Sequence, residues 1–212
     1  MNSKQRVSDV TGVILSGGKS SRMGLNKSLL IIDEIPMIQK IYDTMKSVFE
    51  EIIISTNEPE LYDFIDTEKV EDIYNGFGPL GGIHAALKYS NTERIFVVTA
   101  DMPFLLPDLF KFLIAIETEE NIVAPKAGNR IHFLCGIYGK QLIPVAENIL
   151  SASKVARDNN KELIKSSLSL WNFAERAGAE IVDVEEKIFY MKDLFFNINT
   201  PEDFEYVKDR LI

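Results

Sequence analysis

Short apolar runs alternate with amphipathic stretches along most of the chain. Runs rich in Val and Ile that end in turn residues are typical of buried strands, and they predict strands at 11–15, 52–56, 70–73, 95–100 and 122–125. Apolar residues three or four positions apart are typical of helices with one buried face, and they predict helices at 36–49, 61–65, 83–89 and 107–117. Strand and helix therefore alternate.

This alternation predicts an α/β fold of the three-layer α/β/α, Rossmann-like type, with a mostly parallel central sheet. Ligands of such folds bind at the carboxyl ends of the strands. The last third of the chain is less regular. Strands are expected at 133–138 and 180–184 and helices at 140–150 and 162–177, but their order and direction in the sheet stay open.

Length and composition favour one compact unit. The 212 residues are 46% hydrophobic and 26% charged, which is typical of a globular chain of single-domain size. No tandem repeat, low-complexity tract or linker interrupts the pattern. We therefore expect residues 1–212 to form a single domain.

Charge and cysteine content restrict the partners and the compartment. The formal net charge of −9 opposes general nucleic-acid binding. The apolar runs are too short to span a bilayer, and the polar residues 1–9 do not resemble a secretory signal. The lone cysteine, Cys135, cannot form an intrachain disulfide and suits a reducing compartment. We expect a cytoplasmic protein with neither nucleic acid nor membrane as a partner.

A glycine-rich loop with several cations follows the first predicted strand. From Leu15 to Lys27 it reads Leu-Ser-Gly-Gly-Lys-Ser-Ser-Arg-Met-Gly-Leu-Asn-Lys. Glycines let backbone amides approach phosphate oxygens, and Lys19, Arg22 and Lys27 add positive charge to an acidic chain. The spacing matches neither a Walker loop nor the dinucleotide fingerprint. We interpret the loop as a triphosphate-binding site, and the alternative is a solvated Gly/Ser turn.

An acidic residue follows the strand predicted at 95–100. Asp101 stands directly after this strand and ahead of Met102 and Pro103. A carboxylate at the end of a central strand can hold Mg²⁺ against substrate phosphates. The alternative is an aspartate that only begins a turn.

Two further segments are candidates for binding. Residues 76–82 are glycine-rich and open a predicted helix, and Asp72, upstream, can accept hydrogen bonds from guanine. A plain turn and a solvated charge explain these residues equally well. Asn197 and Asn199 can face one ligand if their segment is extended, although residues 200–203 after them also predict a capped helix start.

The two histidines give no sign of catalysis. His84 and His132 are isolated in apolar surroundings and are expected to be packed or exposed. No Ser-His-Asp or Cys-His arrangement is supported, which disfavours acyl transfer.

Together these motifs resemble the molybdenum cofactor guanylyltransferases, the MobA family within the sugar-nucleotidyltransferase-like superfamily. The resemblance extends over the whole chain and is carried by segments 15–18, 22–27, 71–72, 78–82, 101–103 and 197–202. It implies a single nucleotidyltransferase domain at 1–212. Such an enzyme uses GTP, a molybdopterin-type cofactor and Mg²⁺, and it yields the guanine dinucleotide form of the cofactor and pyrophosphate.

The resemblance also implies roles for individual residues. Nucleotide contacts are expected from Leu15, Ser16, Gly17, Gly18, Lys27, Ser55, Asn57, Asp72 and Asp101, and acceptor contacts from Gly81, Gly82, Asn197 and Asn199. Arg22, Lys27 and Asp101 are expected to be catalytic, with the metal on Asp101. The family often has Ala at position 16 and Asn at position 55, so Asn57 can replace the latter contact. Ala100 stands where a Cys is common, which leaves the carboxylate of Asp101 intact.

The loop motif is shared across the superfamily and does not specify the base. One alternative is a related nucleotidyltransferase that uses CTP or another phosphorylated acceptor. A second alternative is a non-catalytic nucleotide-binding or chaperone-like module. The family resemblance further implies transient contacts with proteins of cofactor biosynthesis and molybdoenzyme maturation.

Overall fold

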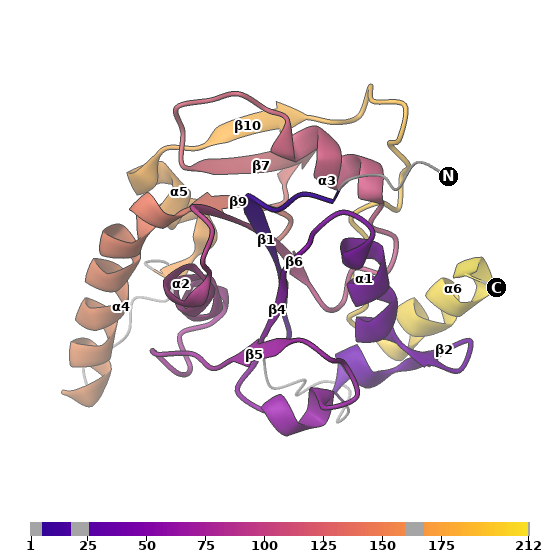
Figure 1. Ribbon diagram of the computed structural model, residues 1–212, viewed down its shortest axis with the longest axis horizontal. Helices are drawn as coiled ribbons and strands as arrows, with labels where there is room; N and C mark the ends of the chain where they lie inside the picture. Colours follow the sequence, from indigo (N-terminus) through magenta and orange to yellow (C-terminus); the bar gives the residue numbers. More distant parts are fainter. Residues whose placement is uncertain (1–5, 18–25, 160–167, 212) are drawn as a thin grey trace.

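The structure is a computed structural model that describes residues 6–17, 26–159 and 168–211. Within these ranges one sheet runs through the molecule (Figure 1). Its strands are β1 (Val10–Leu15), β4 (Ile52–Ser55), β5 (Glu68–Val70), β6 (Arg94–Thr99), β7 (Ile122–Ala127), β8 (Arg130–Ile131), β9 (Gly136–Gly139) and β10 (Glu180–Asp183). A separate hairpin pairs β2 (Ile31–Ile32) with β3 (Ile35–Pro36).

The sheet has the order β10-β7-β9-β6-β1-β4-β5, with β8 paired to β7. Strand β1 is parallel to β4 and β6, β5 is parallel to β4, and β10 is parallel to β7. Strand β9 is antiparallel to both of its neighbours, β6 and β7. The predicted, mostly parallel central sheet is therefore confirmed.

Helices cover both faces of the sheet (Figure 1). The helical segments are η1 (Lys27–Leu29), α1 (Met37–Lys46), η2 (Pro59–Tyr62), α2 (Pro79–Tyr89), α3 (Pro107–Ile114), η3 (Lys140–Leu142), α4 (Ile143–Asp158), α5 (Leu170–Ala177) and α6 (Pro201–Leu211). Apolar residues of α1 and α3 form one core with the sheet, and those of α2, α4 and α5 form a second core. Two cores with a sheet between them confirm the three-layer architecture.

The bounds of most elements differ from their prediction, and four of these differences have a clear structural basis. The strand expected at 70–73 is β5 at Glu68–Val70, because its pairing stops where β4 ends at Ser55. The strand expected at 133–138 begins only at Gly136, after a turn closed by Cys135 N and His132 O at 2.9 Å. The helix expected at 140–150 starts as η3 and continues to Asp158.

The fourth difference concerns the helix expected at 162–177. Helix α5 begins at Leu170, since the Ser169 side chain caps it by accepting a hydrogen bond from Asn172 N. Residues 160–167 lie outside the described ranges. No helix within the ranges that the structure describes is long and apolar enough to span a membrane.

Gly136 marks the closest approach within the sheet. It pairs with Val97 on β6, and a Cβ at this position would collide with the carbonyl oxygen of Val123 on β7. We predict that Gly136→Ala lowers the free energy of unfolding by about 1–3 kcal/mol, because the strands must move apart. Thermal unfolding should show a fall in Tm of about 5 °C. Gly17→Ala is the matched control, since a Cβ there has no neighbour within 4 Å, and an equal fall in both variants would contradict the explanation.

Candidate functional site at the carboxyl edge of the sheet

The carboxyl ends of β1, β4, β5 and β6 meet at one edge of the sheet. Parallel register pairs Leu15 with Ser55 on one side and with Thr99 on the other. Beyond the register, Ser16 N donates to Ser55 O at 2.9 Å and Ala100 N donates to Leu15 O at 3.0 Å. Residues predicted from distant parts of the sequence are thus neighbours at this edge.

A buried tyrosine joins the first loop to the segment that follows β4. The Tyr62 hydroxyl bonds to Ser16 Oγ at 2.8 Å and Ser28 Oγ at 2.9 Å, and it accepts from Asn26 Nδ2 at 2.9 Å. Ser28 is held in turn by Asn26 Oδ1, which caps η1. The two described ends of the predicted phosphate loop, residues 16–17 and 26–28, are therefore anchored through Tyr62.

Tyr62 is a residue that sequence reasoning missed. A tyrosine within a short helical stretch is typical of an ordinary core position, and nothing in its neighbours indicates a contact with the loop. Its side chain is 1% exposed, yet its hydroxyl collects three polar partners from residues 16–28.

At the carboxyl edge, Asp72 pairs with Asn57 beside the start of α2. Asn57 Nδ2 donates to Asp72 Oδ2 at 3.1 Å, and Asp72 N donates to Asn57 Oδ1 at 3.0 Å. Burial raises the pKa of the Asp72 carboxyl, against the lowering effects of the Asn57 hydrogen bond and of nearby His84. This two-way pairing fixes the carboxylate at the edge of the site.

Gly81 and Gly82 let the helix lie directly on this edge. A Cβ at Gly82 would approach Ser55 Oγ to 2.9 Å and Leu15 Cδ2 to 3.1 Å. At Gly81 it would lie 3.0 Å from Tyr74 O and 3.4 Å from Asp72 Oδ2. Both glycines, expected on the acceptor side, thus lie against residues expected to bind the nucleotide.

Lys27 meets the segment near the chain's C-terminus. Its Nζ donates to Asn199 Oδ1 at 3.1 Å, although the two residues are 172 positions apart. Asn197 Nδ2 instead donates to Phe195 O at 2.9 Å. Asp203 accepts from the backbone of Asn199 and Thr200, both at 2.8 Å, so the predicted helix cap is confirmed and coexists with the contact to Lys27.

Asp101 follows β6 and contacts the 197–199 segment. Thr99 Oγ1 donates to Asp101 Oδ1 at 2.6 Å, and Ile198 N donates to Asp101 O at 3.0 Å. Within the described part of the chain, no three His, Cys, Asp or Glu side chains gather around one point. A single carboxylate fits Mg²⁺, which is usually bound through one or two carboxylates together with substrate phosphates and water.

Three predicted residues fall outside the described ranges: Gly18, Lys19 and Arg22. Gly17 is described and exposed, with open space around the position of a Cβ.

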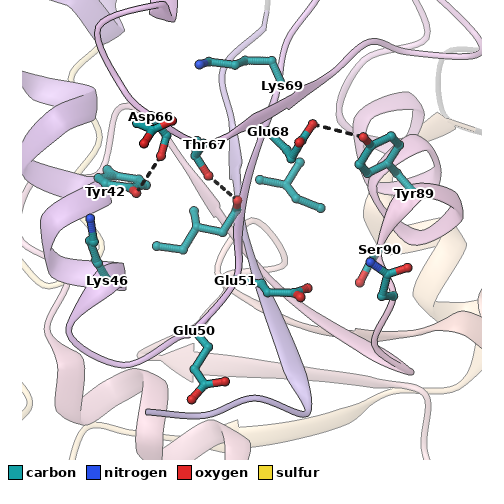
Figure 2. Close-up of a pocket in the computed structure, with 13 residues that line it drawn as sticks. Tyr42, Lys46, Glu50, Glu51, Asp66, Thr67, Glu68, Lys69, Tyr89 and Ser90 are labelled. Atoms are coloured by element: carbon teal, nitrogen blue, oxygen red, sulfur yellow. Dashed lines mark hydrogen bonds between the residues drawn. The ribbon is translucent and has the colours of Figure 1, made fainter.

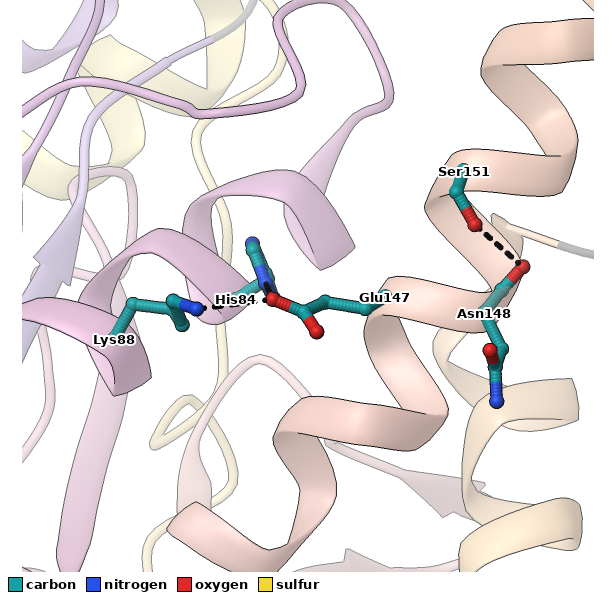
Figure 3. A network of polar contacts seen from close by, with 5 residues as sticks. All are labelled: His84, Lys88, Glu147, Asn148 and Ser151. Atoms are coloured by element: carbon teal, nitrogen blue, oxygen red, sulfur yellow. Dashed lines mark hydrogen bonds and ion pairs between the residues drawn. The ribbon is translucent and has the colours of Figure 1, made fainter.

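The two histidines are packed side chains, one of the two outcomes predicted for them, and Cys135 is a core residue. His84 is fully buried and its Nε2 lies 3.3 Å from Glu147 Oε1, which also pairs with Lys88 at 3.1 Å (Figure 3). His132 stacks on Phe195 with ring centroids 3.9 Å apart, and burial lowers the pKa of His132 to about 4. Cys135 is fully buried, and burial raises the pKa of its thiol.

A separate recess lies at the amino ends of β4 and β5 (Figure 2). It has a volume of about 700 Å³ and is lined by residues of mixed charge that include Lys46, Glu51, Glu68 and Lys69. It opens at the edge opposite to Asp72 and Asp101, so it is not part of the site.

The fold and the polar residues at the carboxyl edge of its sheet are those of the nucleotidyltransferase class of α/β domains. A family model for the MobA-like NTP transferase domain matches residues 12–167. The chain belongs to this family.

Curated relatives match this chain over nearly its full length. A Clostridium perfringens protein named "Probable molybdenum cofactor guanylyltransferase" is 35% identical over 92% of this chain and 94% of the relative. A Pelotomaculum thermopropionicum protein with the same name is 34% identical over 91% and 89%.

Solved structures share the fold. The structure of a protein from Aquifex aeolicus has 26% identity and a TM-score of 0.70, covering 90% of this chain and 93% of that one. Molybdopterin-guanine dinucleotide biosynthesis protein A from Archaeoglobus fulgidus has 20% identity and a TM-score of 0.76, covering 95% and 98%.

We predict that Tyr62→Phe destabilises the fold and loosens the ends of the predicted phosphate loop. Removing one hydroxyl leaves three polar groups short of a partner, which lowers the free energy of unfolding by about 1–3 kcal/mol. Denaturant unfolding measures this loss, and a raised KM for the nucleotide reports on the loop. Tyr42→Phe is the control, because the Tyr42 hydroxyl makes one 3.3 Å bond, to Asp66 O. Equal losses in the two variants would argue against the three-partner anchor.

Proposed function

We propose that this protein transfers GMP from GTP to the molybdenum-molybdopterin cofactor, which forms the molybdopterin guanine dinucleotide cofactor and pyrophosphate. The observation that carries the proposal is the meeting of Asp72, Lys27 and Asp101 at one sheet edge. Asp72 follows β5, Asp101 follows β6, and Lys27 opens η1 after the first loop. All three belong to segments at the carboxyl edge of the parallel strands. Family membership and the names of the relatives support the same reaction.

Asp72 is proposed to select guanine. Its carboxylate accepts hydrogen bonds, and the guanine N1–H and amino group present two donors side by side. Asn57 holds the carboxylate from the other side. Leu15, Ser16 and Ser55 lie close together at this edge, and Gly82 packs against them. We assign Leu15, Ser16 and Ser55 to the nucleotide, and Gly81 and Gly82 to the acceptor.

The phosphates are proposed to lie along the first loop. Backbone amides at Gly17 and Gly18 and the cations of Arg22 and Lys27 offset the phosphate charge. Asn199 orients the Lys27 ammonium through its 3.1 Å contact, and with Asn197 it borders the path of the acceptor. The loop thereby aligns the triphosphate for displacement at the α-phosphorus.

The reaction is a phosphoryl-type substitution without a protein nucleophile. A terminal phosphate oxygen of the acceptor forms a bond to the α-phosphorus of GTP, while the bond to the β-phosphate bridging oxygen breaks and pyrophosphate leaves in line. Asp101 is proposed to hold Mg²⁺, whose charge polarises the α-phosphate and stabilises the transition state. The Asp101 side chain is fixed for this task by Thr99. Positioning and charge supply most of the rate.

The setting of the reaction is part of the proposal. We place the reaction in the cytoplasm, since the lone cysteine suits a reducing compartment. We assign the reaction to a single domain spanning 1–212. Handing a labile cofactor onward requires transient contacts with proteins that make and receive it. The alternative, a CTP-dependent or other nucleotidyltransferase, is tested by supplying each nucleotide with Mg²⁺ and molybdopterin. Turnover selective for CTP would overturn the guanylyl proposal.

We predict that Asp101→Asn lowers kcat about 100-fold or more while the protein stays folded. Asparagine keeps an oxygen for the Thr99 hydroxyl but loses the charge that holds a divalent cation. Product formation from GTP and molybdopterin measures the effect. Asp108→Asn, which neutralises an exposed carboxylate on α3 paired with Lys111, should keep wild-type kcat. Full activity in Asp101→Asn would support the non-catalytic module instead.

We predict that Asp72→Asn raises the KM for GTP by about 10- to 100-fold, because one guanine donor is left facing an amide donor. The stability of the fold should not decrease. Burial raises the pKa of the Asp72 carboxyl, because it disfavours the charged form. At neutral pH the buried charge therefore lowers the free energy of unfolding, and the neutral amide of asparagine removes this effect. Steady-state kinetics with GTP and CTP and thermal unfolding test both parts. In the exposed control Asp63→Asn, neither quantity should change.

A further inference from the structure

The chain's only tryptophan is half exposed on the same edge of the sheet as Asp101. Trp171 is 52% exposed and stands in the first turn of α5. Helix α5 precedes β10, which runs parallel to β7, and two residues connect helix and strand. The end of α5 therefore lies near the amino end of β10. Its first turn, with Trp171, lies toward the opposite, carboxyl edge of the sheet.

A chain of contacts leads from Asp101 to Trp171. Asp101 O accepts from Ile198 N, and Phe195, three residues earlier, stacks on His132 at 3.9 Å. The next residue, Phe133, meets Trp171 with ring centroids 6.1 Å apart and planes at 81°. Direct contacts alternate with short stretches of backbone along this path, and strand β9, which follows this loop, is adjacent to β6.

The Phe133–Trp171 pair is held in place. Tyr138 OH donates to Phe133 O at 2.6 Å, which ties the loop to the buried β9. A perpendicular contact covers at most one face of the indole, so another face stays open to a planar ring. A fixed aromatic ring open on one face is the kind of surface on which heterocycles stack.

The two sides of the site take different rings. Asp72 follows β5, at one end of the sheet, whereas α5 lies beside β9 and β7 toward the other end (Figure 1). Asp101 follows β6, between them. With guanine at Asp72 and the α-phosphate at Asp101, the side of Trp171 is left to the acceptor. Neighbouring strands lie about 5 Å apart. The distance from β6 to β9 is therefore similar to the length of a bicyclic ring that carries a phosphate on its side chain.

We infer that Trp171, backed by Phe133, is the stacking platform for the pterin ring of the acceptor. This inference rests on the proposed function, because the pterin is the acceptor of that reaction. Trp171 sets the affinity for the ring and leaves the affinity for GTP unchanged.

Binding is tested with neopterin monophosphate, a stable phosphorylated pterin, on the full chain with Mg²⁺. In the wild type, the pterin should quench the fluorescence of the sole tryptophan in a saturable way. Polarisation of the pterin's own fluorescence should show about tenfold weaker affinity in Trp171→Ala and a smaller loss in Trp171→Phe. GTP-dependent thermal stabilisation should be equal in all three proteins, which also shows that the variants fold.

The matched control is Tyr89→Ala. Tyr89 is also 52% exposed, but it lies at the end of α2 by the recess on the amino edge. It should bind the pterin as the wild type does, and an equal loss in both variants would overturn the platform. In the guanylyl transfer assay, Trp171→Ala should raise the acceptor KM about tenfold with kcat nearly unchanged.

The assay separates the two proposals. If the wild type forms the guanine dinucleotide and Trp171→Ala keeps the wild-type acceptor KM, the platform is wrong and the proposed function stands. If the wild type forms no product yet neopterin monophosphate still quenches Trp171, the platform stands and the proposed transfer is wrong. Absence of quenching in the wild type overturns the platform.

Discussion

The parallel register of β1 with its two neighbours is the constraint on which the site depends. Leu15 lies opposite Ser55 and Thr99, so the chain leaves three adjacent strands at the same height. One shift in register would turn every following side chain to the other face of the sheet. The two apolar cores prevent such a shift, since Val13 and Ile14 are fully buried against opposite layers. Hydrophobic packing thereby sets the positions of the polar edge residues.

Much of the architecture is readable from the sequence because buried strands and amphipathic helices carry strong periodic signals. The α/β layers, the strands before Ser16 and Asp101, and the helix cap after Asn199 follow from local patterns. The family resemblance named residues such as Asp72, Asp101 and Asn199, which the structure brings to this edge. Local pattern also argued against catalysis by the histidines, and His84 and His132 are buried in the structure.

What the sequence could not give arises from contacts between distant segments. The place of β9 between β6 and β7 depends on pairing, not on periodicity, and the end of β5 follows from the length of β4. Tyr62 carries no local sign that its hydroxyl meets Ser16, Asn26 and Ser28. The placement of Gly81 and Gly82 against Asp72 likewise required the packed fold.

The bond between Lys27 and Asn199 has a consequence for biosynthesis. It joins the first loop to a segment that the ribosome completes only after nearly the whole chain has emerged. The early strands can pair during translation, because they are close in sequence. The lysine predicted to bind phosphate, in contrast, gains its contact with Asn199 only once that segment has been synthesised, so shorter nascent fragments lack this contact. The contact that joins the first loop to the segment at Asn199 is thus formed late in biosynthesis.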